Sequence, residues 1–196
     1  EVATVEVVEP STELFHHQYE VSAPRCDDNS QTVTFTFNER GHHTYRLLEL
    51  SAETGQVRTL IEETNEKYVN YNRLYRHDFD DGRRILWTSE RDGHNHIYLY
   101  DRQTARLIRQ VTKGDFYVRE IQRVDEKQGL VYFSANGPTG LRDSDKPSAK
   151  TEEDPYLIHY YKIGFDGKHL VCLTPEEGHH RATYTDDMAY LLDTYS

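Results

Sequence analysis

The hydrophobic and polar residues between Asp78 and Asp101 follow a pattern of turns and strands, DFDDGRRILWTSERDGHNHIYLYD. The runs RILWTS and HIYLYD are rich in β-branched and aromatic residues, which favour β-strands. DDG at 80–82 precedes the first run and RDG at 91–93 separates the two, and both contain residue types that tolerate the backbone angles of tight turns. The pattern predicts turn, strand, turn, strand, without helical spacing.

The same turn chemistry recurs along the chain. Comparable turns begin near Asp28, Asp81, Glu126 and Asp187, at intervals of about 45 to 60 residues. A repeat of this length with several short strands is typical of a β-propeller blade. A β-sandwich is the alternative, but its strands need not repeat their turn residues at fixed offsets, so the propeller is the favoured interpretation.

We therefore predict an all-β fold: a partial β-propeller of about three and a half blades of short antiparallel sheets, forming one domain over residues 1–196. Closed propellers have about four to eight blades, so the chain is interpreted as a fragment of a longer protein. The expected blades cover 15–63, 68–114, 115–175 and, incompletely, 176–196. Residues 137–155, rich in Pro, Gly, Ser, Asp and Lys, are expected to form a surface loop.

Composition narrows the choice of partners. The formal net charge is −11, and scattered Lys and Arg among more numerous acids argue against a nucleic-acid partner. The mean hydropathy is −0.86, and no apolar run approaches the ~20 residues of a membrane span. The start, EVATVEVVEP, lacks the pattern of a signal peptide.

Candidate chemistry is sparse. The sequence has no GxSxG, so Ser89 is expected to be a strand-end serine, and no residue is assigned as catalytic. His94 and His96 would share one face of a strand but lack a third ligand, so neither a metal site nor a cofactor is expected. Adjacent carboxylates can bind an ammonium group, but they are usually solvated turn residues, and three such pairs occur: Glu62–Glu63, Glu152–Glu153 and Glu176–Glu177.

Tyrosine is unusually frequent, with 15 residues in the chain. The segment YVNYNRLYR, residues 68–76, concentrates tyrosine and arginine between two predicted blades. These residue types form binding surfaces at low entropic cost. For Tyr68 and Tyr75 we expect packing between blades rather than binding.

The ordered set of motifs resembles a known family. WTSERDG, HIYLYD, QVTKGDFYVREI, VDEKQGLVYFSANG, EDPYLIHYYKIGFDGKHLVCLTPEEG and LLDTYS together are similar to the second half of the propeller of the dipeptidyl peptidase IV family, with bacterial members most similar. The resemblance implies an eight-bladed propeller joined to a C-terminal α/β-hydrolase domain with a Ser-Asp-His triad. It also implies a periplasmic or secreted location and is compatible with a homodimeric parent.

The resemblance further implies a site. Members place an aromatic residue and an arginine along the extended substrate cleft, and the matching region here nominates Tyr71, Asn72 and Arg73 for substrate binding. The family has a Glu-Glu pair that holds the substrate's amino group. None of the three glutamate pairs above lies in the sequence context of that pair.

The expected function is a substrate-gating and substrate-orienting propeller segment. Its parent would be a serine exopeptidase that releases Xaa-Pro or Xaa-Ala dipeptides, and the segment would be inactive by itself. Its partners would be the peptide substrate and the parent's hydrolase domain. The alternative is a non-catalytic propeller scaffold of the TolB or WD-repeat kind, or an inactive relative of the peptidases, since one architecture serves many functions.

Overall fold

The computed structural model describes residues 7–27, 30–136, 154 and 156–196. The chain forms two compact units, Glu1–Asn72 and Arg73–Ser196. The single domain expected from the sequence stays a prediction. Within the described residues, no helix is long and apolar enough to cross a membrane.

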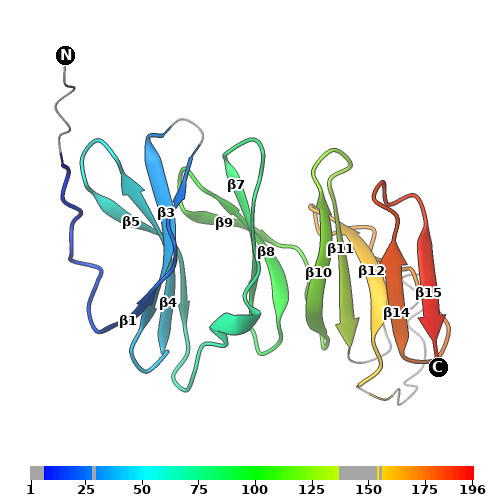
Figure 1. Cartoon of the computed structure of the whole chain (residues 1–196). Helices are drawn as coiled ribbons and strands as arrows, with labels where there is room; N and C mark the ends of the chain where they lie inside the picture. Colours follow the sequence, from blue (N-terminus) through cyan, green and yellow to red (C-terminus); the bar gives the residue numbers. More distant parts are fainter. Residues whose placement is uncertain (1–6, 28–29, 137–153, 155) are drawn as a thin grey trace. The chain divides into compact units, whose positions relative to one another are not determined.

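The first unit contains one antiparallel sheet (Figure 1) with the order β1-β3-β4-β5, and β2 pairs with β3. Its strands are β1 (Gln18–Val21), β2 (Arg25–Cys26), β3 (Thr32–Glu39), β4 (Thr44–Ser51) and β5 (Val57–Thr64). Phe35, Phe37 and Leu48 form its hydrophobic cluster, and Leu14 and Phe15 from the segment before β1 pack against them. That segment therefore covers one face of the sheet.

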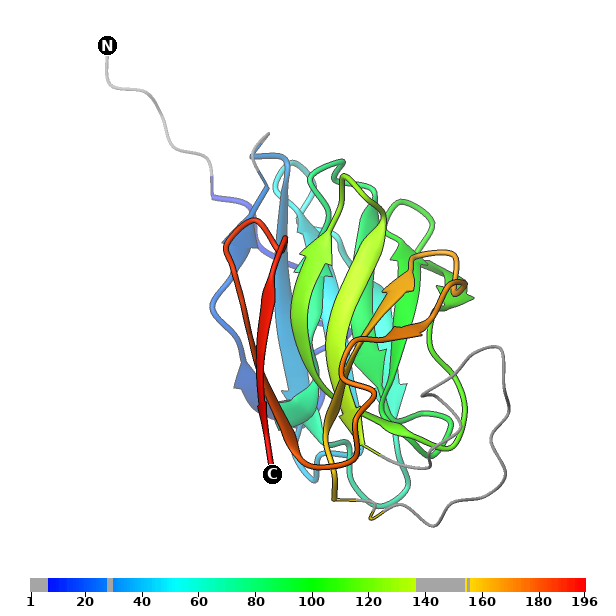
Figure 2. The same ribbon diagram turned by 90° about the vertical axis from the view of Figure 1, so that its right-hand side faces the viewer.

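The second unit contains two four-stranded sheets and a hairpin (Figure 1). The first sheet consists of β6 (Arg76–Asp78), β7 (Arg84–Ser89), β8 (His96–Asp101) and β9 (Arg106–Gln110). The second consists of β10 (Tyr117–Asp125), β11 (Leu130–Asn136), β12 (His159–Gly164) and β13 (Val171–Cys172). The hairpin pairs β14 (His180–Tyr184) with β15 (Leu191–Tyr195). In Figure 2 the long strands β10 and β11 curve together along their length, as twisted sheets do.

One hydrophobic cluster joins the two four-stranded sheets. It includes Leu86, Ile97, Val118 and Phe133, all fully or almost fully buried, and the ring of Tyr75 packs against it. The central strands β7 and β8 are buried along almost their whole length, whereas the outer strand β9 is largely exposed. Hydrophobic and polar residues do not alternate strictly in the run RILWTS, because the side chains on both faces of its strand, β7, are buried.

The predicted turns form as expected. The amide of Gly82 donates to the carbonyl of Phe79 at 2.9 Å, and that of Gly93 donates to the carbonyl of Glu90 at 3.0 Å. Gly82 has φ +65°, a backbone conformation that favours glycine over residues with a Cβ. Both turns are thus four-residue β-turns fixed by local chemistry.

The predicted all-β class and partial propeller are confirmed by these small antiparallel sheets. The blade ranges stay a prediction. One observed sheet or hairpin falls within each range, except that β5 ends at Thr64, one residue beyond the first range. Apart from Asp154, the predicted surface loop 137–155 lies outside the described residues. A three-residue 3₁₀ helix, η1 (Tyr71–Arg73), was not predicted.

Candidate functional site

The three residues nominated for substrate binding form one short element. Tyr71, Asn72 and Arg73 are the whole of η1. Asn72 and Arg73 are exposed, whereas Tyr71 is partly buried. Tyr71 and Asn72 end the first unit and Arg73 begins the second. The turn therefore presents two polar side chains to solvent beside a tyrosine anchored in the first unit.

Tyr71 is anchored by a tyrosine–histidine cluster, made of Tyr19, His42, Tyr45, Tyr68 and Tyr71. The Tyr71 ring stacks on His42, with centroids 5.1 Å apart, and on Tyr45, with centroids 5.9 Å apart. His42 Nδ1 lies 3.1 Å from Asn38 Oδ1, which fixes the plane of the imidazole. The imidazole thus contacts three rings of the cluster, those of Tyr19, Tyr68 and Tyr71.

The cluster also affects the pKa of Tyr71. Desolvation, followed by the influence of the neighbouring Tyr68 hydroxyl, raises the pKa of Tyr71 above its ordinary value. Tyr68 keeps 44% of its surface exposed, while its ring centre lies 5.6 Å from that of His42 and 6.0 Å from that of Tyr71. Its packing between blades stays a prediction. A partly open aromatic surface beside η1 suits stacking against an apolar ring of a ligand.

Arg73 is fixed through its backbone to the end of β7. The Thr88 hydroxyl donates to the Arg73 carbonyl at 3.5 Å and accepts the amide of Tyr75 at 2.7 Å. The amide of Thr88 in turn donates to the carbonyl of Tyr75 at 3.1 Å. These contacts extend the β6–β7 ladder to the edge of η1 and leave the Arg73 side chain exposed.

The turn that follows β7, residues 89–95 (SERDGHN), links this region to the next sheet. Ser89 is buried at the strand end and accepts from Arg91 Nε at 2.9 Å, as expected for a strand-end serine. Asn95 Nδ2 donates to the carbonyl of Val118 at 2.7 Å, and the amide of Val118 donates back to the carbonyl of Asn95 at 2.9 Å. The Tyr117 hydroxyl donates to Glu90. The motif thus has a structural role.

Tyr117 brings together residues that the sequence did not nominate. Burial and the hydrogen bond to Glu90 raise its pKa to about 12, and the nearby guanidinium groups of Arg73 and Arg119 oppose the rise. The Arg119 guanidinium lies 5.7 Å from the centre of the Tyr117 ring. In sequence, Tyr117 and Arg119 are simply strand residues about 45 positions from Arg73, so no local signal pairs them with it.

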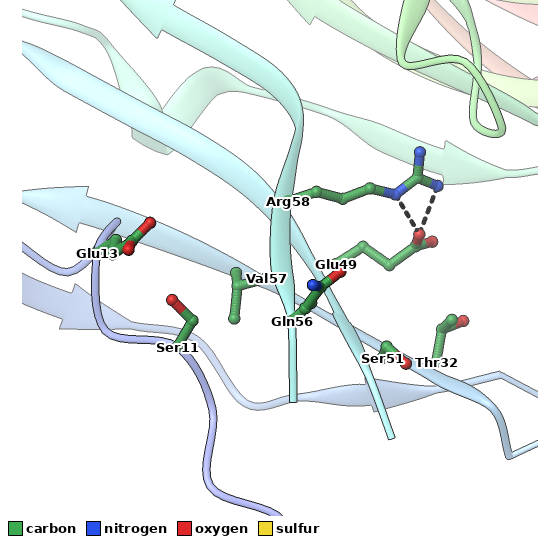
Figure 3. Close-up of a pocket in the computed structure, with 8 residues that line it drawn as sticks. All are labelled: Ser11, Glu13, Thr32, Glu49, Ser51, Gln56, Val57 and Arg58. Atoms are coloured by element: carbon green, nitrogen blue, oxygen red, sulfur yellow. Dashed lines mark hydrogen bonds and ion pairs between the residues drawn. The ribbon is translucent and has the colours of Figure 1, made fainter. Parts of the chain in front are cut away.

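A hollow of about 540 Å³ lies elsewhere in the first unit. Figure 3 shows its lining side chains on two sides of β5, with Glu49 and Arg58 directed away from Ser11, Glu13 and Val57. Arg58 Nε donates to Glu49 Oε1 at 2.8 Å, so these two charges largely compensate each other. The labelled lining side chains do not converge on one point (Figure 3), and they include no histidine or lysine.

The remaining candidates from the sequence differ in their surroundings. Glu62 forms an ion pair with Arg46, while Glu63 is buried and Glu176 and Glu177 are exposed. Glu152–Glu153 lie outside the described residues. His96 is buried, with Nδ1 3.1 Å from the Thr112 hydroxyl and Nε2 3.0 Å from the Gly114 carbonyl, so both nitrogens are engaged.

In the described part of the chain, no group of three or more His, Cys, Asp or Glu side chains is arranged to hold a metal ion. Cys26 and Cys172 do not form a disulfide with each other.

Two solved structures are similar to this chain in fold. A Bacteroides ovatus protein assigned as a dipeptidyl aminopeptidase IV matches with a TM-score of 0.65 and 23% identity over 92% of this chain and 26% of its own. Porphyromonas gingivalis dipeptidyl peptidase 4 matches with a TM-score of 0.64 and 24% identity over 86% of this chain and 22% of its own. The chain thus spans about a quarter of the length of each.

The sequence profile of the family described as "Dipeptidyl peptidase IV (DPP IV) N-terminal region" matches residues 3–196, almost the entire chain. Together with the small antiparallel sheets, this match confirms the resemblance first inferred from the ordered motifs. The chain belongs to the dipeptidyl peptidase IV N-terminal region family.

Proposed function

We propose that the chain gates and orients substrates in a serine exopeptidase of the dipeptidyl peptidase IV type, which releases Xaa-Pro or Xaa-Ala dipeptides from peptide N-termini. The catalytic serine would belong to an α/β-hydrolase domain of the parent, and no residue of this segment would take part in bond cleavage. The parent would act in the periplasm or outside the cell, either as a monomer or as a homodimer.

The observation that carries the proposal is the presentation of Asn72 and Arg73. Both side chains are exposed on η1, while the backbone of Arg73 is bonded to Thr88 and the adjacent Tyr71 is held by ring stacking. A substrate-contacting group works best when its backbone is fixed and only its side chain meets the ligand. Arg73 would contact the peptide backbone beyond the cleaved bond, and Tyr71 and Asn72 would border the same contact.

The test uses the intact parent enzyme with two substrates: a short chromogenic Ala-Pro derivative and a longer peptide that begins with Ala-Pro. Arg73→Ala should lower kcat/KM for the longer peptide about tenfold or more, because one charge-assisted hydrogen bond is lost. The short derivative ends before the proposed contact, so its kcat/KM should change little.

Arg106→Ala is the matched control, since Arg106 is also an exposed arginine of the second unit but lies on the outer strand β9. If Arg73→Ala affected neither substrate, the assigned role of Arg73 would be wrong. A parent that cleaves neither substrate would instead support the alternative, a non-catalytic propeller scaffold.

A further inference from the structure

Arg119 occupies a break in the regular pairing of β10 with β11. Val118 pairs with Ala135 and Glu120 pairs with Ser134, so the residue between them has no opposite partner. This is the arrangement of a β-bulge, which redirects a side chain and is frequent beside functional sites. Arg119 is exposed at this point, while its neighbour Val118 is buried.

The redirected arginine lies over a fixed ring. Its guanidinium is 5.7 Å from the centre of the Tyr117 ring, within the range of a cation–π contact. The Tyr117 hydroxyl donates to Glu90, and the turn carrying Glu90 is bonded to β10 through Asn95 and Val118. The ring is therefore held from two directions, and the position of the Arg119 head group is restricted.

Arg73 belongs to the same neighbourhood, because its guanidinium also acts electrostatically on the Tyr117 phenol. Arg73 precedes β6 and Tyr117 begins β10, the first strands of two consecutive sheets. In the part of the chain that the structure describes, neither Arg73 nor Arg119 forms an ion pair with a carboxylate. With Glu90, the group carries two positive charges and one negative charge.

We propose that Arg119, together with Arg73 and the Tyr117 ring, forms a carboxylate-binding subsite for the part of a peptide substrate beyond the cleaved bond. This inference rests on the proposed function. Guanidinium groups match carboxylates in geometry as well as in charge. The raised pKa of Tyr117 keeps the phenol neutral, so it does not repel an anion. The nearby acid Glu120 accepts a hydrogen bond from Gln122 at 3.2 Å.

The carboxylate could be the C-terminus of a short peptide or an acidic side chain, and a matched series of peptides beginning with Ala-Pro separates the two. One peptide has a free C-terminal acid, the second is its C-terminal amide, and the third is an amide with one internal glutamine replaced by glutamate. The intact parent enzyme is assayed with each peptide for kcat/KM and, by calorimetry with the catalytic serine blocked, for binding.

The wild type should prefer at least one of the two acidic peptides over the neutral amide, and added salt should weaken the preference. Arg119→Gln should reduce that preference about fivefold without changing kcat/KM for the amide, as expected for an exposed ion pair. Arg119→Lys should retain part of the preference. Arg106→Gln, the control on β9, should leave it unchanged.

An acid preference that is the same in wild type and Arg119→Gln would overturn the subsite. An equal loss with all three peptides would also overturn it, because that outcome indicates a structural role for Arg119. If the parent cleaved no peptide but bound the acidic ones in an Arg119-dependent manner, the proposed peptidase function would fail while the subsite stood.

Discussion

Two threonines in corresponding places allow a direct test of how the second unit is held together. Thr112 follows β9 and Thr174 follows β13, and each is 1% exposed. The Thr112 hydroxyl accepts the amide of Ile97 at 2.9 Å and lies 3.1 Å from His96 Nδ1. The Thr174 hydroxyl accepts the amide of Tyr160 at 3.0 Å. The two sites therefore differ in the number of bonds that the hydroxyl makes.

Replacing each threonine by valine removes the hydroxyl while nearly keeping the side-chain volume. Thr112→Val leaves both the Ile97 amide and His96 Nδ1 without this partner. Thr174→Val leaves only the Tyr160 amide, because His159 Nδ1 bonds the Thr174 carbonyl at 2.7 Å, and valine keeps that carbonyl. Each buried polar group left unpaired costs about 1 to 3 kcal/mol. Thr112→Val should therefore lower the free energy of unfolding by about 1 to 3 kcal/mol more than Thr174→Val.

Urea unfolding of the two variants measures this difference through the midpoint and the slope of the transition. Thr112→Ser restores the hydroxyl and should recover most of the lost stability. Thr183→Val, at an exposed position of β14, is the control and should change the free energy by no more than about 0.5 kcal/mol. Equal losses at Thr112 and Thr174, or a larger loss at Thr174, would refute the hydrogen-bond reasoning.

Two further predictions follow from the phenol of Tyr117 and from a pair of glycines. Burial and Glu90 raise the pKa of Tyr117 to about 12, above the ordinary tyrosine value of about 10. The protonated Tyr117 phenol therefore contributes fully to the free energy of unfolding below pH ~10, and this contribution is lost as the pH rises towards 12. Glu90→Gln should lower this pKa, as measured by tyrosinate absorbance with Tyr117→Phe as the reference, and an unchanged titration would contradict the role of Glu90. Gly82 (φ +65°) and Gly55 (φ +71°) both have a backbone conformation that favours glycine. A Cβ added at Gly82 would meet open space, whereas a Cβ added at Gly55 would overlap the carbonyl of Glu9. Gly82→Ala should cost about 1 to 2 kcal/mol of unfolding free energy and Gly55→Ala more, and the opposite order in urea unfolding would contradict the contact with Glu9.

Local chemistry explains what could be predicted from the sequence. The turns ending at Gly82 and Gly93 form within four residues, and the strands that come after them, β7 and β8, could be predicted from their β-rich composition. Their burial on both faces does not follow from composition, because it depends on neighbouring sheets. The family could be inferred because its motifs occur in a fixed order over most of the chain.

Which residues surround the candidate site could not be predicted from the sequence, because segments far apart in the chain bring them together. His42 becomes the centre of the cluster around Tyr71 only when the β3–β4 turn meets the segment before η1, more than 20 residues later. Arg119 is redirected by a bulge that exists only against β11. No pattern within YVREI distinguishes this arginine from an ordinary exposed strand residue, so the sequence gives no indication of the role proposed here for Arg119.

The central claim is that the chain orients peptides for an exopeptidase that removes N-terminal dipeptides. The most direct measurement is mass spectrometry of the products that the intact parent forms from a peptide beginning with Ala-Pro and from its N-acetylated counterpart. The account predicts release of free Ala-Pro from the first peptide and no cleavage of the second. Cleavage of both peptides, or of neither, would contradict it.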